Sequence, residues 1–274
     1  MAATLRVGAV ACPAKVNDLD GNLAAAAAWA GRAAEAGLGL LLFPELSLTG
    51  YRTTGPAIVP LDAAHPACRR LGELAAGHRL ILAAGLAWRE GDDRYIAHGL
   101  WLPDGAFHLY RKTHLGQRER TEYAAGDHLP VFALPGVTVG IQLCLEQHFP
   151  EIAQTLALKG AQLILCPHAT PRLGPAERRE SWHISLRARA YDNCVYILAA
   201  NQAGDNGQGT VYHGGALLVG PTGQVLAEDF SGQAAMITGE LDLDRIAGAR
   251  TTPRGMCRRY YAHERRPELY RWEK

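Results

Sequence analysis

An unbroken apolar run, Leu38–Phe43, follows directly on an alanine-rich segment of the chain. A run without polar alternation is typical of a strand that is covered on both faces, as in the sheets of α/β proteins. The alanine-rich segment, Leu23–Ala36, is predicted to be a helix with Asn22 as its N-cap and Gly37 at its end. Together the two segments indicate a sheet with helices packed against it.

The same alternation of strand-like and helix-like segments continues along the chain. We predict helices at Pro66–Gly77, Phe149–Lys159 and Glu177–Asn193, and strands at Val7–Ala11, Leu80–Ala87, Tyr95–Leu102, Ala106–Leu109, Val137–Leu143, Leu163–Cys166, Val195–Ala200, Gly214–Val219, Gln224–Ala227 and Ala235–Leu241. Because one open sheet does not hold so many strands comfortably, we expect two packed sheets with helices outside them.

The domain organisation follows from the absence of a Pro/Ser-rich linker. Gly204–Gly209 is interpreted as a flexible loop within the domain and not as a domain boundary. Residues 1–274 are therefore predicted to form a single α/β domain. The tail from about residue 250 is expected to pack on this domain or on a partner subunit.

Composition excludes several classes of protein. The chain contains 48% hydrophobic and 20% charged residues, which excludes a disordered or fibrous protein. Its 28 basic and 27 acidic side chains leave a net charge of +1, so we expect no nucleic-acid partner. Arg32 and Glu35 interrupt the longest apolar stretch, so we expect no membrane partner. The six cysteines and eleven histidines show no metal-ligand spacing, which predicts no metal site and favours a cytoplasmic protein with reduced thiols.

Three reactive side chains each follow a predicted strand. Glu45 comes after the run that ends at Phe43, Lys112 after the strand-like segment that ends at Leu109, and Cys144 after the segment that ends at Leu143. Ligands of α/β sheets bind beyond the carboxyl ends of the strands, and a thiol beside a helix N-terminus is a candidate nucleophile. Alone, each of the three has an ordinary structural explanation, such as a packed cysteine or a surface lysine. Together they predict a candidate site at one edge of the sheet.

The segments around these residues resemble the Glu, Lys and Cys motifs of the nitrilase superfamily of carbon–nitrogen hydrolases. They read Glu45-Leu-Ser-Leu-Thr-Gly-Tyr51, Tyr110-Arg-Lys-Thr-His-Leu115 and Cys144-Leu-Glu-Gln-His-Phe-Pro-Glu151. Further segments in the family's order are Gly126-Asp127, Arg187–Asn193, Asn201, Gly214-Gly215, Pro221–Gly223 and Arg265–Tyr270. The resemblance thus extends from Val7 to Tyr270.

This resemblance implies a four-layer αββα sandwich that pairs into a homodimer or a higher homo-oligomer. It implies that Cys144 is the nucleophile, that Glu45 transfers protons, and that Lys112 and the backbone N–H of Leu145 stabilise the oxyanion. Glu119, or Glu122 if the spacing is misread, is implied as a second carboxylate that orients Lys112 or the attacking water. No metal or organic cofactor is implied. The proton transfer predicts a closed site that raises the pKa of Glu45 and lowers that of Cys144.

The substrate is expected to be a small amide, carbamoyl compound or nitrile, with Leu145, Tyr51, His148 and Trp182 lining its pocket. True nitrilases usually carry Trp where this chain has Leu145, so an amidase or N-carbamoyl amidase is favoured over a nitrilase. Three alternatives remain open at this point. His148 stands four residues after Cys144 and suggests a Cys–His dyad. A catalytically silent member of the family that serves as a scaffold subunit is a second alternative. An arginine-rich segment, with Arg172, Arg178, Arg179, Arg187 and Arg189, is either a substrate-carboxylate site or a set of helix-surface charges.

Overall fold

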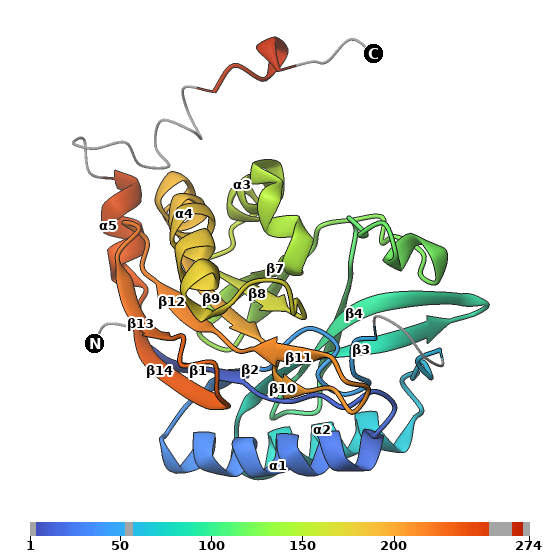
Figure 1. Ribbon diagram of the computed structural model, residues 1–274. Coiled ribbons are helices and arrows are strands. Elements are labelled where there is room, and N and C mark those ends of the chain that lie inside the picture. The colour runs from blue at the N-terminus through green and yellow to red at the C-terminus, as the bar shows by residue number, and fades with distance from the viewer. Residues whose placement is uncertain (1–3, 53–56, 252–264, 271–274) are drawn as a thin grey trace.

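Two six-stranded sheets form the centre of the molecule in a computed structural model that describes residues 4–52, 57–251 and 265–270 (Figure 1). The first sheet has the order β14-β1-β2-β3-β4-β5 and consists of β1 (Thr4–Ala11), β2 (Leu40–Leu42), β3 (Ile81–Glu90), β4 (Asp93–Trp101), β5 (Phe107–Arg111) and β14 (Ala235–Asp242). The second has the order β13-β12-β9-β8-β7-β6 and consists of β6 (Val131–Leu134), β7 (Val137–Ile141), β8 (Leu163–His168), β9 (Tyr196–Asn201), β12 (Ala216–Val219) and β13 (Val225–Asp229).

Helices cover the outer face of each sheet. Helices α1 (Leu19–Glu35) and α2 (Pro66–His78) lie against the first sheet, and α3 (Pro150–Leu158) and α4 (Pro175–Asn193) lie against the second (Figure 1). A fifth helix, α5 (Asp244–Thr251), follows β14. The expected four-layer αββα sandwich is therefore confirmed. In the described residues, every helix is too short or too polar to cross a membrane.

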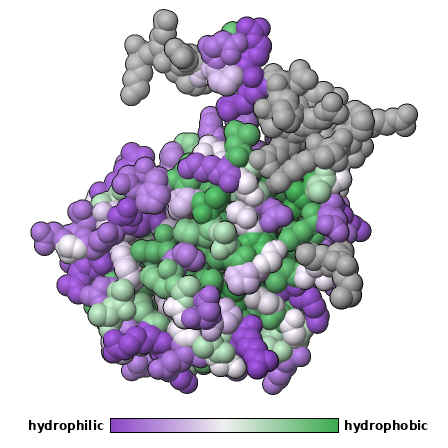
Figure 2. All heavy atoms as spheres, turned by 180° about the vertical axis from the view of Figure 1, so that it is seen from behind, coloured by the Kyte–Doolittle hydropathy of each residue, from purple (hydrophilic) through white to green (hydrophobic). Residues whose placement is uncertain are grey.

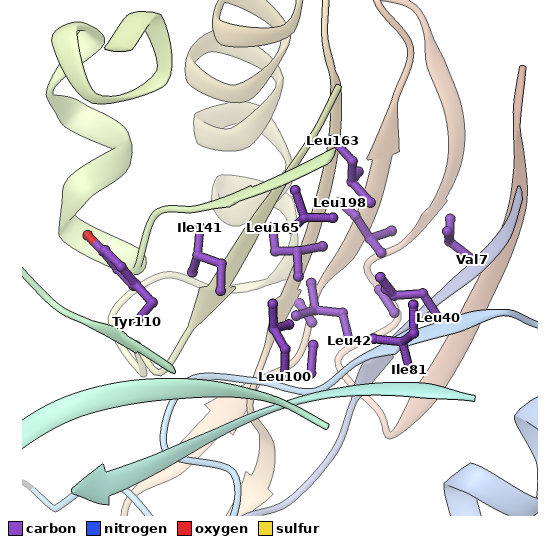
Figure 3. Close-up of a cluster of buried hydrophobic side chains, with 14 of the residues drawn as sticks. Val7, Leu40, Leu42, Ile81, Leu100, Tyr110, Ile141, Leu163, Leu165 and Leu198 are labelled. Carbon is purple, nitrogen blue, oxygen red and sulfur yellow. The ribbon is translucent and has the colours of Figure 1, made fainter. Parts of the chain in front are cut away.

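Three apolar layers hold the sandwich together. The central layer joins the inner faces of the two sheets and includes Leu42, Ile81, Leu165 and Leu198, which point toward one another in Figure 3. The two other layers join each sheet to its helices. Strands at the centre of both sheets are thus covered on both faces, which explains their continuous apolar sequences. From behind, hydrophobic residues gather across the middle of the molecule, with hydrophilic residues around them (Figure 2).

The two sheets share one arrangement at their centres. Strands β1, β2 and β3 are parallel, and so are β7, β8 and β9. Because the carboxyl ends of parallel strands lie at one edge of a sheet, the loops after β2, β7 and β8 approach one another. The candidate residues Glu45 and Cys144 stand in two of these loops.

The start of α1 differs from the prediction. Asp18, and not Asn22, caps this helix, and its carboxylate accepts a hydrogen bond of 3.1 Å from the first turn. Asn22 is buried inside the helix, and its amide donates to the carbonyl oxygens of Lys15 (2.7 Å) and Leu48 (2.8 Å). Both side chains have the chemistry of a cap, and tertiary contacts decide which one serves.

Several short elements were not anticipated. The segment interpreted as a loop, Gly204–Gly209, begins inside β10 (Ala203–Asp205), which forms a hairpin with β11 (Val211–His213). Strand β6 and helix α5 were also missed. The tail beyond residue 251 lies outside the described residues except for 265–270, where Arg265 and Tyr270 line one pocket with residues of α3 and α4.

Gly85 of β3 lies beneath the loop that carries Glu45. A Cβ atom at this position would stand 2.2 Å from the backbone nitrogen of Leu46. We expect Gly85→Ala to displace this loop, to lower the free energy of unfolding by about 1–3 kcal/mol and to reduce any activity that depends on Glu45. Urea denaturation measures the change in the free energy of unfolding.

Gly31 of α1 provides the matched control, because a Cβ atom there meets nothing within 4 Å. Gly31→Ala is expected to raise the free energy of unfolding by about 0.5–1 kcal/mol through helix propensity. Equal stability of the two alanine variants would show that Gly85 does not limit the position of the Glu45 loop.

Candidate active site

The loop after β2 holds Glu45 through hydrogen bonds to its neighbours. The hydroxyls of Ser47 and Thr49 accept from the backbone N–H groups of Gly85 (3.1 Å) and Ala87 (3.0 Å) in β3. The amide of Gln202 donates to the carbonyl oxygen of Glu45 (2.8 Å). Side chains thus replace the sheet hydrogen bonds that β2 no longer provides, and the Glu45 carboxylate is fully buried.

Lys112 follows β5 and is buried between two carboxylates. Its backbone N–H donates to the carbonyl oxygen of Ile96 (2.8 Å), which continues the pairing with β4. Its Nζ lies 2.7 Å from Glu45 Oε1 and 2.9 Å from Glu119 Oε1. The other oxygen of Glu119 accepts from the backbone N–H of Gly116 (2.7 Å). These contacts bring together three of the four residues predicted to be catalytic.

Cys144 stands at a sharp turn between β7 and a short 3₁₀ helix, Cys144–His148. Its backbone has a φ of +44°, a left-handed conformation that side chains other than glycine rarely adopt. Such strain persists only where the surroundings fix the backbone, and it is common at functional sites. A backbone hydrogen bond from Ala169, directly after β8, reaches the sulfur.

Glu146 connects the cysteine turn to the lysine loop. This buried carboxylate accepts from the backbone N–H of Leu143 (2.6 Å), from the backbone N–H (2.8 Å) and Oγ1 (2.6 Å) of Thr113, and from the hydroxyl of Tyr110 (2.7 Å). It therefore fixes Lys112 and Cys144 relative to each other. No role was assigned to Glu146 from the sequence, although it stands two residues after the cysteine within the quoted motif.

The electrostatics of the site agree with one expectation and contradict another. Burial raises the pKa of Glu45 to about 7, against the opposing effect of the Lys112 ammonium. Burial lowers the pKa of Lys112, but Glu45 and Glu119 outweigh it, so this pKa lies well above its usual range. The expected lowering for Cys144 is wrong, since burial and then Glu45 raise its pKa to about 12 despite Lys112. At neutral pH the resting site has a protonated thiol and a partly ionised Glu45.

A cavity of about 610 Å³ opens over the cysteine. Of the predicted pocket residues it contains Leu145 and Tyr51, whose hydroxyl lies 3.3 Å from Glu119 Oε1. Its lining is Tyr51, Lys112, Gly116, Gln117, Arg118, Glu119, Cys144, Leu145, Ala169, Thr170, Pro171 and Arg172. Of the wall from Ala169 to Arg172, the sequence analysis singled out Arg172 alone, although the whole wall follows β8 just as Cys144 follows β7.

His148 and Trp182 are not among the residues that line this cavity. His148 is exposed and lines another hollow with Leu173 and Ile184. His148 is the last residue of the 3₁₀ helix that starts at Cys144. Residues three apart share a face of a 3₁₀ helix, so the α-helical face expected for a Cys–His dyad does not form. Trp182 is fully buried between the second sheet and its helices, with its ring 4.7 Å from that of His168.

The fallback carboxylate, Glu122, pairs with Arg52 and not with Lys112.

The arginines of the arginine-rich segment do not gather at one site. Arg179 binds Glu228 (2.8 Å), Arg187 donates to Gly223 O (2.8 Å) and Arg189 donates to Gln147 O (3.2 Å). Arg172 lines the cavity, and Arg178 is buried behind its wall.

We expect Glu146→Gln to destabilise the protein, because the new NH₂ group would face backbone and hydroxyl donors. Loss of buried acceptor capacity predicts a decrease of about 2–4 kcal/mol in the free energy of unfolding, measured by urea denaturation. The matched control is Glu180→Gln on the exposed side of α4, which is expected to stay within about 0.5 kcal/mol of the parent protein. A similarly small effect of Glu146→Gln would contradict the connecting role.

Comparisons with known proteins agree with this architecture. Residues 6–251 match the family model described as carbon-nitrogen hydrolase. The chain is 29% identical over 77% of its length to an (R)-stereoselective amidase from Pseudomonas sp., with 76% of that protein covered. It is 27% identical over 76% of its length to N-carbamoylputrescine amidase from Arabidopsis thaliana, with 73% of that protein covered.

A solved structure of a variant amidase from Nesterenkonia sp. AN1 is also similar. Its TM-score is 0.79 at 28% identity, and the match covers 97% of this chain and 95% of that one. In that amidase the acetamide moiety of fluoroacetamide is covalently attached to the active-site cysteine. With the family model matching most of its length, this chain belongs to the carbon–nitrogen hydrolases of the nitrilase superfamily.

Proposed function

We propose that this protein hydrolyses the C–N bond of a small linear amide or N-carbamoyl compound, with Cys144 as the nucleophile. The observation that carries the proposal is the buried Glu45–Lys112–Glu119 group beside a cysteine that lines a cavity. The alkylated active-site cysteine of the Nesterenkonia amidase and the amidase names of other relatives support it.

The first half of the reaction forms a thioester. Glu45 takes the proton of Cys144 while the sulfur attacks the carbonyl carbon. Lys112 and the backbone N–H of Leu145 stabilise the negative charge on the tetrahedral oxygen. Glu45 then gives the proton to the leaving nitrogen, the C–N bond breaks, and ammonia leaves.

The second half hydrolyses the thioester. Glu45 removes a proton from water, the resulting hydroxide attacks the thioester carbon, and the proton returns to the departing sulfur. The Glu119 carboxylate binds the Lys112 ammonium and thereby keeps Lys112 in position during both halves of the reaction. Since the resting thiol is protonated, deprotonation and attack are coupled, and no stable thiolate is required.

Products distinguish the substrate classes. A simple amide gives ammonia and an acid, whereas an N-carbamoyl compound gives an amine, carbon dioxide and ammonia. A nitrile consumes two waters and gives the acid and ammonia, and Leu145 beside the nucleophile favours the amidase and carbamoylase alternatives over this one. A scaffold protein would give none of these products, and its partner binding would survive Cys144→Ala.

We also propose that the protein acts as a cytoplasmic homodimer or higher homo-oligomer. Large apolar side chains are exposed on the outer side of the second helical layer, among them Leu158 (44% exposed), Ile184 (70%) and Tyr191 (43%). A second copy packing on this layer would remove them from water.

We expect iodoacetamide to alkylate Cys144 faster than Cys12, Cys68, Cys166 and Cys194, because these four are buried and Cys144 lines the cavity. Loss of the base in Glu45→Gln should slow the labelling of Cys144 by roughly tenfold or more. Peptide mass spectrometry measures both rates, and Lys112→Ala is expected to act in the same direction. Glu180→Gln is the control variant.

Labelling of Cys144 no faster than that of Cys12, in a folded sample, would contradict the catalytic role. The scaffold alternative would then become the preferred interpretation.

The pH dependence should report Glu45. Because its pKa is raised to about 7, kcat/KM is expected to rise with pH with a midpoint near pH 7, and to level off about one unit higher, where the base is almost fully ionised. Lys112, with its raised pKa, stays charged across this range and adds no alkaline limb. The measurement is the initial rate of ammonia release from about pH 5.5 to about pH 8.5. An unchanged acid limb in the residual activity of Glu45→Gln would assign that limb to another group.

A further inference from the structure

The charged side chains around the Cys144 cavity are unbalanced. Lys112, Arg118 and Arg172 are basic, whereas Glu119 is the one acidic residue of the lining that the structure describes. Both oxygens of Glu119 are already bound, one by Lys112 and the other by the backbone N–H of Gly116. Lys112 is in turn bound by Glu45 and Glu119, so its charge is compensated within the site, and the positive charge that faces an entering ligand is on the side of the lining where Arg172 stands.

Arg172 stands in the wall that follows β8 and is exposed. Among residues 4–52, 57–251 and 265–270, no carboxylate pairs with its guanidinium. A guanidinium at the side of a cavity, with its donors available, is suited to bidentate binding of a carboxylate.

A second cation lies behind the same wall. Arg178 is 3% exposed, and its Nη2 donates to the carbonyl oxygen of Thr170 (3.0 Å). The side chain of Asn201 holds Thr170 as well, accepting from its N–H (2.9 Å) and donating to its carbonyl oxygen (3.2 Å). The wall is thus fixed from behind, and Arg178 is built into its support.

Arg178 lacks the acidic partner that a buried cation normally has. Within the described part of the chain no carboxylate lies in salt-bridge contact with it, and its Nε has no hydrogen-bond acceptor. Burial lowers its pKa, and negative charge at Cys144 raises it, so its field reaches the reacting sulfur. An unpaired buried charge is costly to maintain, which indicates that its counter-charge enters the cavity from outside.

We propose that the substrate is an amide or carbamoyl compound that also carries a carboxylate, which Arg172 binds at the cavity wall while the buried Arg178 adds positive potential from behind. This inference rests on the proposed function and names its substrate class. It disfavours compounds with a protonated amine at the corresponding position, because they would place a second cation beside Arg172.

Two alkylating agents of nearly equal size test the site without a substrate. Iodoacetate is anionic and iodoacetamide is neutral, and in both the cysteine sulfur attacks the CH₂ carbon and displaces iodide. The quantity measured is the rate constant for iodoacetate divided by that for iodoacetamide at Cys144, normalised to the same ratio for a small free thiol. This normalised ratio is expected to fall about tenfold in Arg172→Gln. Arg172→Lys, which keeps the charge, should retain most of the ratio, and added salt should lower it.

The matched control is Arg179→Gln, since Arg179 binds Glu228 away from the cavity. Its ratio is expected to equal that of the parent protein. An iodoacetamide rate that falls less than the iodoacetate rate in Arg172→Gln separates loss of the carboxylate contact from a general change at Cys144. An iodoacetate-to-iodoacetamide ratio that Arg172→Gln leaves unchanged would overturn the inference.

Three amides of one chain length then test the substrate class: glutaramate, pentanamide and 5-aminopentanamide. The kcat/KM for ammonia release is expected to be highest for glutaramate and lowest for the amine, and Arg172→Gln should lower it about tenfold or more for glutaramate alone. Equal hydrolysis of all three would overturn the inference and leave the proposed function standing. Should none be hydrolysed while Cys144 resists iodoacetamide, the proposed function itself fails.

Discussion

One buried ammonium between two carboxylates determines how the site is built. Lys112 reaches Glu45 and Glu119 at hydrogen-bond distance in a region almost without solvent. Two ionised carboxylates and one ammonium would leave an uncompensated negative charge there, so burial disfavours ionisation of one of them. The raised pKa of Glu45 is the result, and it gives this residue a proton affinity suited to transfer near neutral pH. Burial, followed by the charge of Glu45, raises the pKa of the Cys144 thiol, which is therefore protonated in the resting site.

The fold supplies these groups from separate chain segments. Glu45 follows β2 and Lys112 follows β5 in the first sheet, whereas Cys144 follows β7 in the second. These three residues stand in different loops. The Glu146 carboxylate joins the loop of Lys112 to the loop of Cys144. The hydroxyl groups of Ser47 and Thr49 fix the loop of Glu45, because they accept hydrogen bonds from β3 that β2 no longer accepts. Each loop is thus held by polar side chains that the mechanism itself does not use.

Sequence reasoning reached the layers and the reactive residues because both leave strong local signals. Apolar runs such as Leu38–Phe43 indicate a strand covered on both faces, and Glu45, Lys112 and Cys144 each follow a predicted strand within a segment that resembles a family motif. Signals that depend on tertiary packing were not accessible. The rotation of α4 buries Trp182, the 3₁₀ geometry turns His148 away from the expected face, and the pKa of Cys144 depends on how far burial outweighs Lys112. The hairpin β10–β11 was missed because each of its strands has three residues and the segment between them, residues 206–210, is rich in glycine and polar residues.

Because the site is divided between the two sheets, its geometry depends on how the two sheets pack against each other. The sheets meet through one continuous apolar layer, and the carboxylate and the thiol stand on opposite sides of it. A partly opened sandwich that retained every helix and strand would still separate Glu45 from Cys144, the proposed base and nucleophile. The proposed reaction therefore depends on the closed state of the central layer, and we expect activity and native packing to be lost together in one cooperative event.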